Sequence, residues 1–177
     1  MTDRNAGGDS DTESNPDADP NSEANDGTRT GVFVVQSEDE REDAFAVRYD
    51  VFVDEQGVDE ELEWDEHDEP DAEATHLVAY DDGVVVGAAR LRPYDAETAK
   101  VERVVVAEDR RGEAWGERLM HAAEDEARAA GFSRVKLHAQ VRVRGFYESL
   151  GYHAVGEEFE DAGIPHVEMR KPLDEDV

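Results

Sequence analysis

The segment from Val101 to Tyr152 constrains the fold more than any other part of this chain. It opens with a β-branched run typical of a strand, and from Trp115 its apolar residues recur at helical spacing. Gly112 and Gly116 lie between strand and helix, where they let the backbone turn tightly and approach a ligand. Because the first N–H groups of a helix are free and carry the positive end of its dipole, this order indicates a phosphate or pyrophosphate site. A plain tight turn would use the same glycines.

Separated segments in both halves of the chain resemble one known family. The loop Arg111–Gly116 reads R-x-x-A-x-G and resembles motif A of the GNAT N-acetyltransferase superfamily, R/Q-x-x-G/A-x-G/A. The segments Phe146–Tyr152 and Asp161–His166 resemble the ElaA/YjcF branch of that superfamily, as does Arg48–Gln56 in the first half. Separated matches that follow the order of the family argue against a chance resemblance.

The resemblance implies an α+β protein with a central, mixed, mostly antiparallel β-sheet flanked by helices. The residue pattern agrees with this fold class. It predicts strands near residues 32–35, 76–80, 84–91, 101–106, 134–139, 152–159 and 166–171, and helices that begin near residues 38, 115 and 142. Phe45, Tyr49 and Phe52 are spaced to share one face of the first helix, and residues 54–75 are predicted to form a long acidic loop.

The charge of the chain indicates its setting. It has 47 acidic residues against 18 lysines and arginines, a formal net charge of −29, and residues 1–30 carry only −6 of that charge. Because a large net charge on one small domain gives strong self-repulsion at low salt, screening by molar salt, where the Debye length is ~3 Å, would relieve it. We therefore expect a cytoplasmic protein of a halophilic organism. An acidic nucleic-acid mimic or a cation buffer is favoured less, because the acids are scattered rather than clustered.

Other classes of function are excluded by composition. No apolar run approaches the ~20 residues that span a bilayer, and no hydrophobic signal segment follows the first methionine, so we expect a soluble protein without a membrane partner. The chain has no cysteine, which excludes a disulfide, a thiol nucleophile and a thiolate metal site, and no basic stripe supports nucleic-acid binding. We expect residues 1–30 to be a disordered acidic tail and residues 31–177 to form one GNAT acetyltransferase domain.

The resemblance implies that acetyl-CoA is the acetyl donor. Its pyrophosphate would lie on the amides of the Arg111–Gly116 loop, and its pantetheine along the strand at residues 101–106. Nearby arginines would add positive charge, or else pair with surface acids: Arg110, Arg111, Arg142 and Arg144. Ala114 and Gln140 depart from the commonest glycine and asparagine of the family. The residues assigned to acetyl-CoA are Val104, Val105, Val106, Arg110, Arg111, Gly112, Glu113, Ala114, Trp115, Gly116, Gln140, Arg144 and Tyr147.

Acetyl transfer to an amine needs a neutral nucleophile, stabilisation of an oxyanion and a proton for the departing thiolate. Tyr147 matches the family position whose phenol protonates the CoA sulfur, although an aromatic pair on a short helix is also typical of a core. Backbone N–H groups near Val104–Val106 are expected to stabilise the oxyanion. The candidate bases are Glu102, which resembles a glutamate of related glucosamine-phosphate acetyltransferases or else faces solvent, and His166, whose imidazole suits proton transfer or is structural.

The acceptor site is the least defined part of the sequence. Glu55, Gln56 and His166 are candidates to line it, and Glu55 and Gln56 otherwise cap the first helix. The acidic stretch Trp64–Glu69 has no ligand spacing that fixes a coordination geometry, so we predict a solvated loop and no metal. The expected activity is acetyl-CoA-dependent transfer to a primary amine, the alternatives being a non-catalytic acyl-CoA-binding or regulatory module and an acidic protein that binds only cations or partners. A homodimer is compatible with the sequence, which does not define the oligomeric state.

Overall fold

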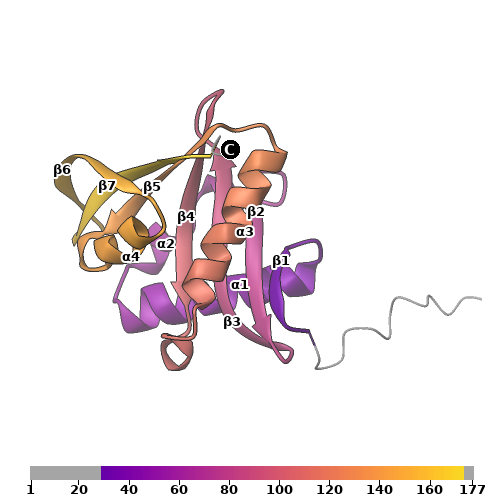
Figure 1. Ribbon diagram of the computed structural model, residues 1–177. Helices are drawn as coiled ribbons and strands as arrows, with labels where there is room; N and C mark the ends of the chain where they lie inside the picture. The colour runs from indigo at the N-terminus through magenta and orange to yellow at the C-terminus, as the bar shows by residue number, and fades with distance from the viewer. Residues whose placement is uncertain (1–28, 174–177) are drawn as a thin grey trace, which may run out of the picture.

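The computed structural model describes residues 29–173, and the tail predicted to be disordered lies almost wholly outside this range. Within the described part, strands and helices follow the predicted order (Figure 1). The strands are β1 (Gly31–Val34), β2 (Thr75–Asp81), β3 (Val84–Pro93), β4 (Thr98–Val106), β5 (Arg134–Gln140), β6 (His153–Asp161) and β7 (Ile164–Pro172). The helices are α1 (Glu38–Arg48), α2 (Glu60–Glu63), α3 (Trp115–Ala129) and α4 (Arg144–Ser149), with a π-helix η1 (Tyr49–Glu55) and 3₁₀ turns η2 (Glu66–Asp68), η3 (Glu108–Arg110) and η4 (Val141–Val143).

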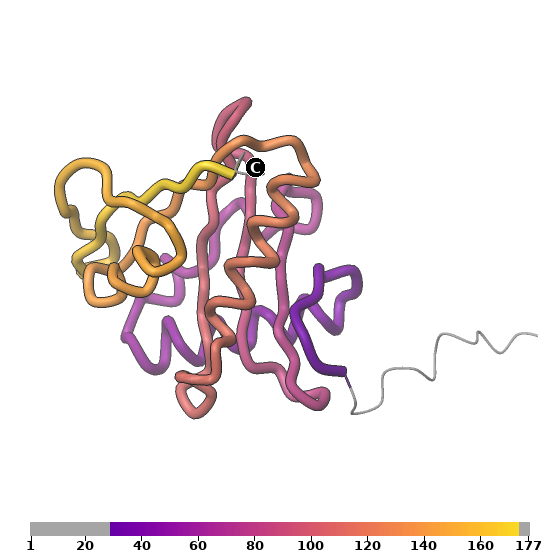
Figure 2. The backbone as a smooth tube through the Cα atoms, viewed as in Figure 1, coloured from indigo at the N-terminus to yellow at the C-terminus, as the bar shows by residue number. Residues whose placement is uncertain are grey.

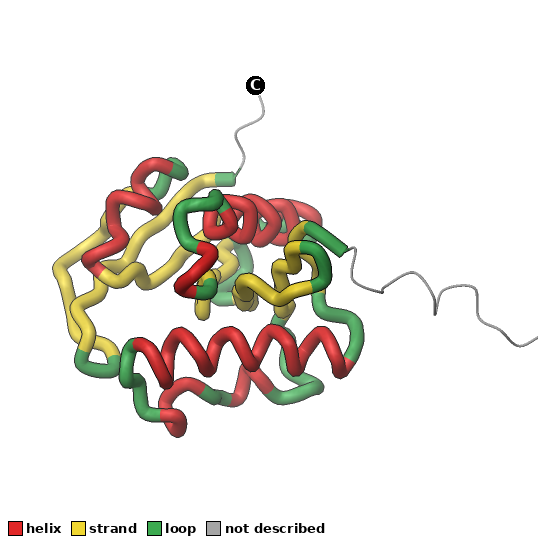
Figure 3. The backbone as a smooth tube through the Cα atoms, turned by 90° about the horizontal axis from the view of Figure 1, so that it is seen from below, coloured by secondary structure: helices red, strands yellow, loops and turns green. Residues whose placement is uncertain are grey.

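The seven strands form one sheet in the order β1-β2-β3-β4-β5-β7-β6. The β4–β5 pair is parallel and every other neighbouring pair is antiparallel, which confirms the predicted mixed, mostly antiparallel sheet. Helices α1 and α3 pack on opposite faces of the sheet (Figure 3). No helix of residues 29–173 has the length and apolar composition to cross a bilayer.

Two apolar cores lie on the two faces of the sheet. Along β2, Leu77 and Ala79 join the core beneath α3, whereas Val78 and Tyr80 join the core beneath α1. All four are buried, as expected for a strand whose successive side chains point to opposite faces. The central strands are therefore held between the two helices, which makes them a rigid base for the segments beside them.

The aromatic residues spaced along one face of the first helix are not the ones most deeply buried against the sheet. The residues buried against the sheet are Ala44, Val47 and Val51, whereas Phe45, Tyr49 and Phe52 are only half-buried. Small side chains let α1 lie close to the sheet, so that the aromatic residues flank the contact instead of filling it. The helix also widens into η1 after Arg48, a change of pitch that the periodicity of the sequence does not indicate.

Strands β4 and β5 separate after a short parallel pairing (Figures 1 and 2). Their register runs only from Thr98 opposite Arg134 to Val101 opposite Leu137, whereas β4 continues to Val106. A bulge interrupts the β3–β4 pairing in the same stretch, and its residue Arg103 has a positive φ of 56°. The end of β4 therefore presents unpaired backbone groups toward a gap in the sheet.

Candidate functional site

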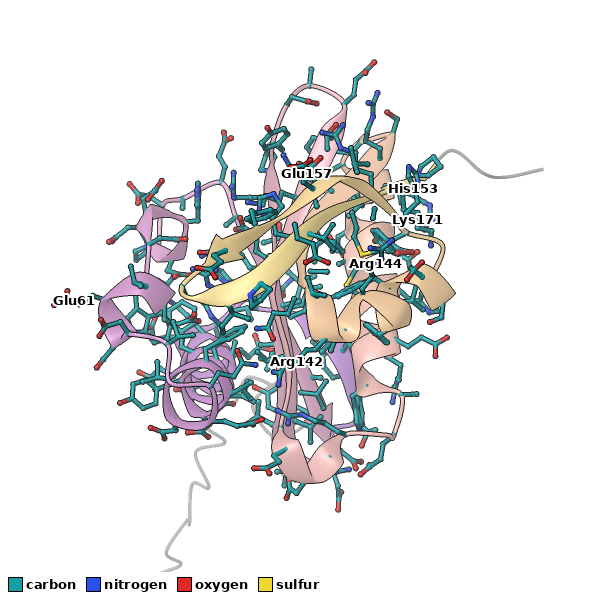
Figure 4. All side chains as sticks on the ribbon, turned by 90° about the vertical axis from the view of Figure 1, so that its left-hand side faces the viewer. Glu61, Arg142, Arg144, His153, Glu157 and Lys171 are labelled. Carbon is teal, nitrogen blue, oxygen red and sulfur yellow. The ribbon has the colours of Figure 1, made fainter. Side chains whose placement is uncertain are left out.

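A cavity of about 730 Å³ occupies the place where β4 and β5 separate. Its wall combines β4, β5, η1, the β4–α3 loop, the start of α3, η4 and α4, with one residue each from β6 and β7. Figure 4 looks toward this side of the molecule and labels Arg142 below the β6–β7 hairpin. Of the residues assigned to acetyl-CoA from sequence, the cavity wall includes Val104, Val105, Val106, Arg110, Arg111, Gly112, Ala114, Trp115, Gly116, Gln140 and Tyr147. Glu113 and Arg144 lie outside that wall.

The β4–α3 loop has the backbone geometry of an anion-binding turn. Gly112 has φ +82°, and Ala114, the residue before α3, has φ +67° without a side-chain cap on the helix. The first intrahelical bond runs from the Arg118 N–H to the Ala114 carbonyl, which leaves the preceding N–H groups of the helix available to a ligand. A Cβ on Gly116 would lie 3.2 Å from the Phe146 ring, so this position is close-packed.

Ion pairs engage three of the four arginines expected near the phosphates. Arg110 bonds to Asp81 and Glu113, and Arg144 to Glu148. Arg111 makes a bidentate pair with Glu55, at 2.7 Å for each N–O contact. Arg142 has no ion pair within the described residues. Its Nε donates to the Gln140 Oε1 at 2.9 Å, which orients the guanidinium at the cavity wall.

The η1 helix ends beside the cavity with the two residues proposed for the acceptor pocket. Gln56 lines the cavity and accepts a hydrogen bond from the Gln140 Nε2 at 2.8 Å. Glu55 is not part of the wall, and its hydrogen bonds with Arg111 lower the pKa of its carboxyl group. The end of η1 is therefore linked both to the β4–α3 loop and to β5.

Tyr147 lies within α4, in the cavity wall, and is only 8% exposed. Its ring packs edge-on against Phe146 and Tyr152, with centroid distances of 5.0 and 6.0 Å. Burial raises the pKa of its phenol to about 12. The hydroxyl group therefore keeps its proton at neutral pH and is a hydrogen-bond donor toward a ligand.

Glu102 lies in the cavity wall but is largely buried rather than facing solvent. Its carboxylate contacts Arg90 at 2.5 Å, Lys100 at 2.9 Å and Arg92 at 3.0 Å. Burial alone would raise the pKa of Glu102, but these three cations outweigh it and hold the pKa well below its usual range. A carboxylate that holds a proton so weakly is a poor general base.

The acidic stretch near Trp64 is not the solvated loop that the sequence predicts. Asp68 is 7% exposed, and its carboxylate accepts hydrogen bonds from Arg48 at 2.7 Å and from Arg90 at 3.0 Å. Arg48 also binds Glu63, which is 2% exposed. The prediction fails because the two buried arginines come from α1 and β3, far away in sequence. Among the described residues, no group of three or more histidine or acidic side chains is arranged to hold a metal ion.

His166 lies in the cavity wall near the start of β7, where it pairs with Gln140 of β5. Its Nδ1 is 2.6 Å from the Ile164 carbonyl oxygen. Because a carbonyl oxygen only accepts, Nδ1 carries the hydrogen of the neutral ring, and Nε2 carries the lone pair. In this tautomer the Ile164 carbonyl engages Nδ1, and Nε2 is the ring nitrogen that can accept a proton.

Sequence reasoning missed several side chains of the cavity wall. His138 follows Leu137, the last β5 residue paired with β4, and so lies where the two strands part. Burial, followed by the charges of Lys100 and Lys136, lowers the pKa of His138 and favours its neutral form. Other missed wall residues are Lys100, Arg103 and Asp161. Strand alternation from Gln140 points to His138, because residues 138 and 140 share one face.

A mixed sheet that opens between two parallel strands, beside a helix N-terminus, defines the class of GNAT-fold proteins. A family model described as an acetyltransferase (GNAT) domain matches residues 25–173. The uncharacterized N-acetyltransferase YjcF of Bacillus subtilis is 41% identical over 141 residues, which are 79% of this chain and 98% of YjcF. This chain belongs to the GNAT acetyltransferase family.

Solved structures agree with the family. An acyl-CoA N-acyltransferase from Pseudomonas aeruginosa and ElaA from Escherichia coli each match with a TM-score of 0.71 and 27% identity. In both cases the match covers 81% of this chain and 99% of the other. YjcF and ElaA represent the branch that the sequence resembles, so this expectation is confirmed.

Proposed function

We propose that this protein transfers the acetyl group of acetyl-CoA to a primary amine of a small molecule or a protein, by direct attack in a ternary complex. The observation that carries the proposal is the cavity between β4 and β5. An unpaired strand edge, a helix N-terminus and Tyr147 border the same space of about 730 Å³. These are the three features that binding and cleaving an acyl thioester require.

The β4–α3 loop and the end of β4 would bind the donor. Backbone N–H groups at the start of α3 would hold the pyrophosphate, and the edge of β4 after Val101 would pair with the amides of the pantetheine arm. An N–H group near Val104–Val106 would donate to the oxyanion that forms on the thioester carbonyl. The bulge at Arg103 supports this role, because it breaks the β3–β4 register in this stretch.

Tyr147 would act as the general acid. When the amine nitrogen has bonded to the carbonyl carbon, collapse of the tetrahedral intermediate breaks the carbon–sulfur bond, and the phenol gives its proton to the departing sulfur. The burial of Tyr147 supports this role, since it keeps the phenol protonated well above neutral pH. Water then returns a proton to the phenolate, and the proton that the base took from the amine leaves to solvent.

His166 is the base that the geometry favours. Its Nδ1–H is engaged by the Ile164 carbonyl, so Nε2 would accept the proton that the attacking amine releases. Three cations keep Glu102 ionised, so Glu102 would not act as the base. It would instead hold the side chains of Arg90 and Lys100 in place. His166 with Gln56, rather than Glu55, would then line the acceptor side.

The first experiment is a calorimetric titration with acetyl-CoA in 2 M potassium chloride, followed by an assay for release of free CoA with a panel of amines. Gly116→Asp places a negative charge at the helix N-terminus and a side chain against Phe146, and should abolish binding. Ala130→Asp adds the same charge at the opposite, exposed end of α3 and should leave binding unchanged.

Binding that is lost only in Gly116→Asp, together with amine-dependent CoA release, would support the proposal. Binding without release by any amine would favour the non-catalytic acyl-CoA-binding module instead. A folded wild type that does not bind acetyl-CoA would refute the proposal.

A further inference from the structure

Helix α3 carries a buried acid on the face that packs against the sheet. Glu124 is 2% exposed, although an acidic side chain is seldom buried without a specific contact. Its Oε2 accepts a hydrogen bond from the Tyr152 hydroxyl at 2.9 Å, and its Oε1 contacts the Lys171 Nζ at 2.8 Å. Each carboxylate oxygen thus has a partner, one in the segment after α4 and the other in β7. Lys171 is labelled in Figure 4.

Tyr152 connects this acid to the cavity. It is 3% exposed, its ring lies edge-on to the Tyr147 ring at 6.0 Å, and its backbone N–H donates to the Tyr147 carbonyl at 3.1 Å. The bond to Glu124 fixes the far end of the Tyr152 side chain. The position of its ring, and hence of the wall behind Tyr147, therefore depends on α3.

The other side of Tyr147 is also fixed. Phe146 packs edge-on against Tyr147 at 5.0 Å, and its ring in turn lies against Gly116 in the first turn of α3. Helix α3 thus contacts both aromatic neighbours of Tyr147. Gly116 in its first turn lies against Phe146, and the Glu124 side chain bonds to Tyr152. The Tyr147 hydroxyl group has no hydrogen bond within the described residues, so packing alone sets the position of the side chain.

We propose that Glu124 is a positioning residue, which holds Tyr152 and thereby keeps the Tyr147 phenol in place at the β4–β5 divergence. Lys171 balances the charge of Glu124 inside the protein. The proposal rests on the proposed role of Tyr147 as the general acid. A buried ion pair is weak evidence for stability, and this one is explained better by the placement it enforces.

The test uses two variants. Tyr152→Phe removes only the hydroxyl group. Glu124→Leu substitutes an apolar side chain of similar size and so removes the contacts with both Tyr152 and Lys171. Glu124→Gln keeps an acceptor for Tyr152 and is the conservative variant. Asp125→Asn, the same acid-to-amide change at the exposed neighbouring position of α3, is the control. Each variant is assayed for kcat and for the KM of acetyl-CoA.

We expect Tyr152→Phe and Glu124→Leu to lower kcat by about 10- to 100-fold, the effect of a small misplacement of a catalytic group, with the KM of acetyl-CoA within about twofold of wild type. Glu124→Gln should retain most of the activity and Asp125→Asn all of it. If kcat is unchanged in folded Tyr152→Phe and Glu124→Leu, or if kcat and KM change together, the positioning role is wrong. Should those two variants fail to fold, Glu124→Asp, which draws the carboxylate back from the Tyr152 hydroxyl by one methylene group, replaces them, and a wild-type kcat in Glu124→Asp would overturn the proposal.

A second readout does not need turnover. Carbon-13 NMR of the Tyr147 ring, assigned with Tyr147→Phe, follows its ionisation at alkaline pH. Burial keeps wild-type Tyr147 protonated at pH 10.5, whereas release of Tyr152 should admit water and lower the Tyr147 pKa toward its ordinary value near 10. An unchanged titration in Tyr152→Phe and Glu124→Leu would overturn the positioning role, even if the transferase activity itself were absent.

Discussion

Arg111 and Glu55 form a bidentate ion pair that connects the β4–α3 loop to the end of η1. Arg111 holds the defining arginine position of motif A and is the residue expected to meet the phosphates of CoA. In the structure its charge is already balanced by Glu55. Arg111 also donates to the Val106 carbonyl at 3.2 Å, so its guanidinium is fixed between β4 and η1.

Glu55→Gln should therefore strengthen acetyl-CoA binding. The phosphates compete with an ion pair that is partly exposed, and pairs of this kind contribute about 0.2–1 kcal/mol, so we expect the Kd to fall by roughly two- to fivefold. Calorimetry measures the change, with Asp54→Asn, at the exposed preceding residue, as the control. A weaker affinity in Glu55→Gln would mean that Glu55 orients Arg111 for the ligand.

Ala114→Gly should stabilise the protein. Ala114 has φ +67°, a conformation that costs a residue with a Cβ about 1 kcal/mol or more relative to glycine. We expect the free energy of unfolding to rise by about 1 kcal/mol and Tm by about 3 °C, measured by thermal denaturation. Ala130→Gly, at the other end of the helix with φ −83°, should instead lower stability. A loss of stability in Ala114→Gly would contradict the strain argument.

Arg142→Gln should weaken acetyl-CoA binding more than Arg144→Gln does. Arg142 lines the cavity, is oriented by Gln140 and has no ion pair among residues 29–173, whereas Arg144 pairs with Glu148 outside the wall. A hydrogen bond between charged groups contributes about 1.5–3 kcal/mol, so we expect at least a roughly tenfold rise in Kd for Arg142→Gln. Equal effects of the two variants would show that only the overall charge matters.

Salt should strengthen acetyl-CoA binding, if the protein is adapted to molar salt as its charge indicates. The chain carries −29, and CoA is itself a polyanion, so repulsion opposes binding at low ionic strength. Affinity should rise between about 0.1 M and 2 M potassium chloride, because the Debye length falls from ~10 Å to ~3 Å or less. Circular dichroism at each salt concentration checks the fold. A steady fall in affinity of the folded protein would sink this prediction.

Local sequence signals predicted much of the fold. The β-branched run before Gly112 is the end of β4, and the apolar spacing after Trp115 is the buried face of α3, with Leu119 and Ala123 fully covered. These elements are predictable because strand and helix periodicity depend on neighbouring residues. Glycine and the helix start also indicated an anion-binding turn in the β4–α3 loop, whereas its individual residues were assigned to acetyl-CoA from the resemblance to motif A, and most of them line the cavity.

Long-range contacts were not predictable. Nothing near Asp68 indicates that Arg48 and Arg90 will cover it, and nothing near Glu102 indicates its three cationic partners. The point where β4 and β5 part depends on the register between two strands separated by α3. His138 was missed for this reason, because its place at the cavity follows from that register.

The buried Asp68 predicts how stability changes at low pH. Burial alone would raise its pKa, but the hydrogen bonds and charges of Arg48 and Arg90 outweigh this and lower the pKa of Asp68 to about 2. Because the folded pKa lies below the unfolded value near 3.9, this contribution is present above pH 4 and is lost as the pH falls toward 2. The shift corresponds to roughly 2–3 kcal/mol of unfolding free energy.

Asp68→Asn should therefore be less stable than wild type at pH 7, by about 3 kcal/mol or more, since two buried arginines lose a charged partner. Its stability should also fall less steeply between pH 4 and 2, because the titrating group is gone. Denaturant unfolding across that range measures both effects, and Asp71→Asn, at an exposed acid of the same segment that makes no ion pair within residues 29–173, is the control. The same slope in wild type and Asp68→Asn would show that other carboxylates govern acid unfolding.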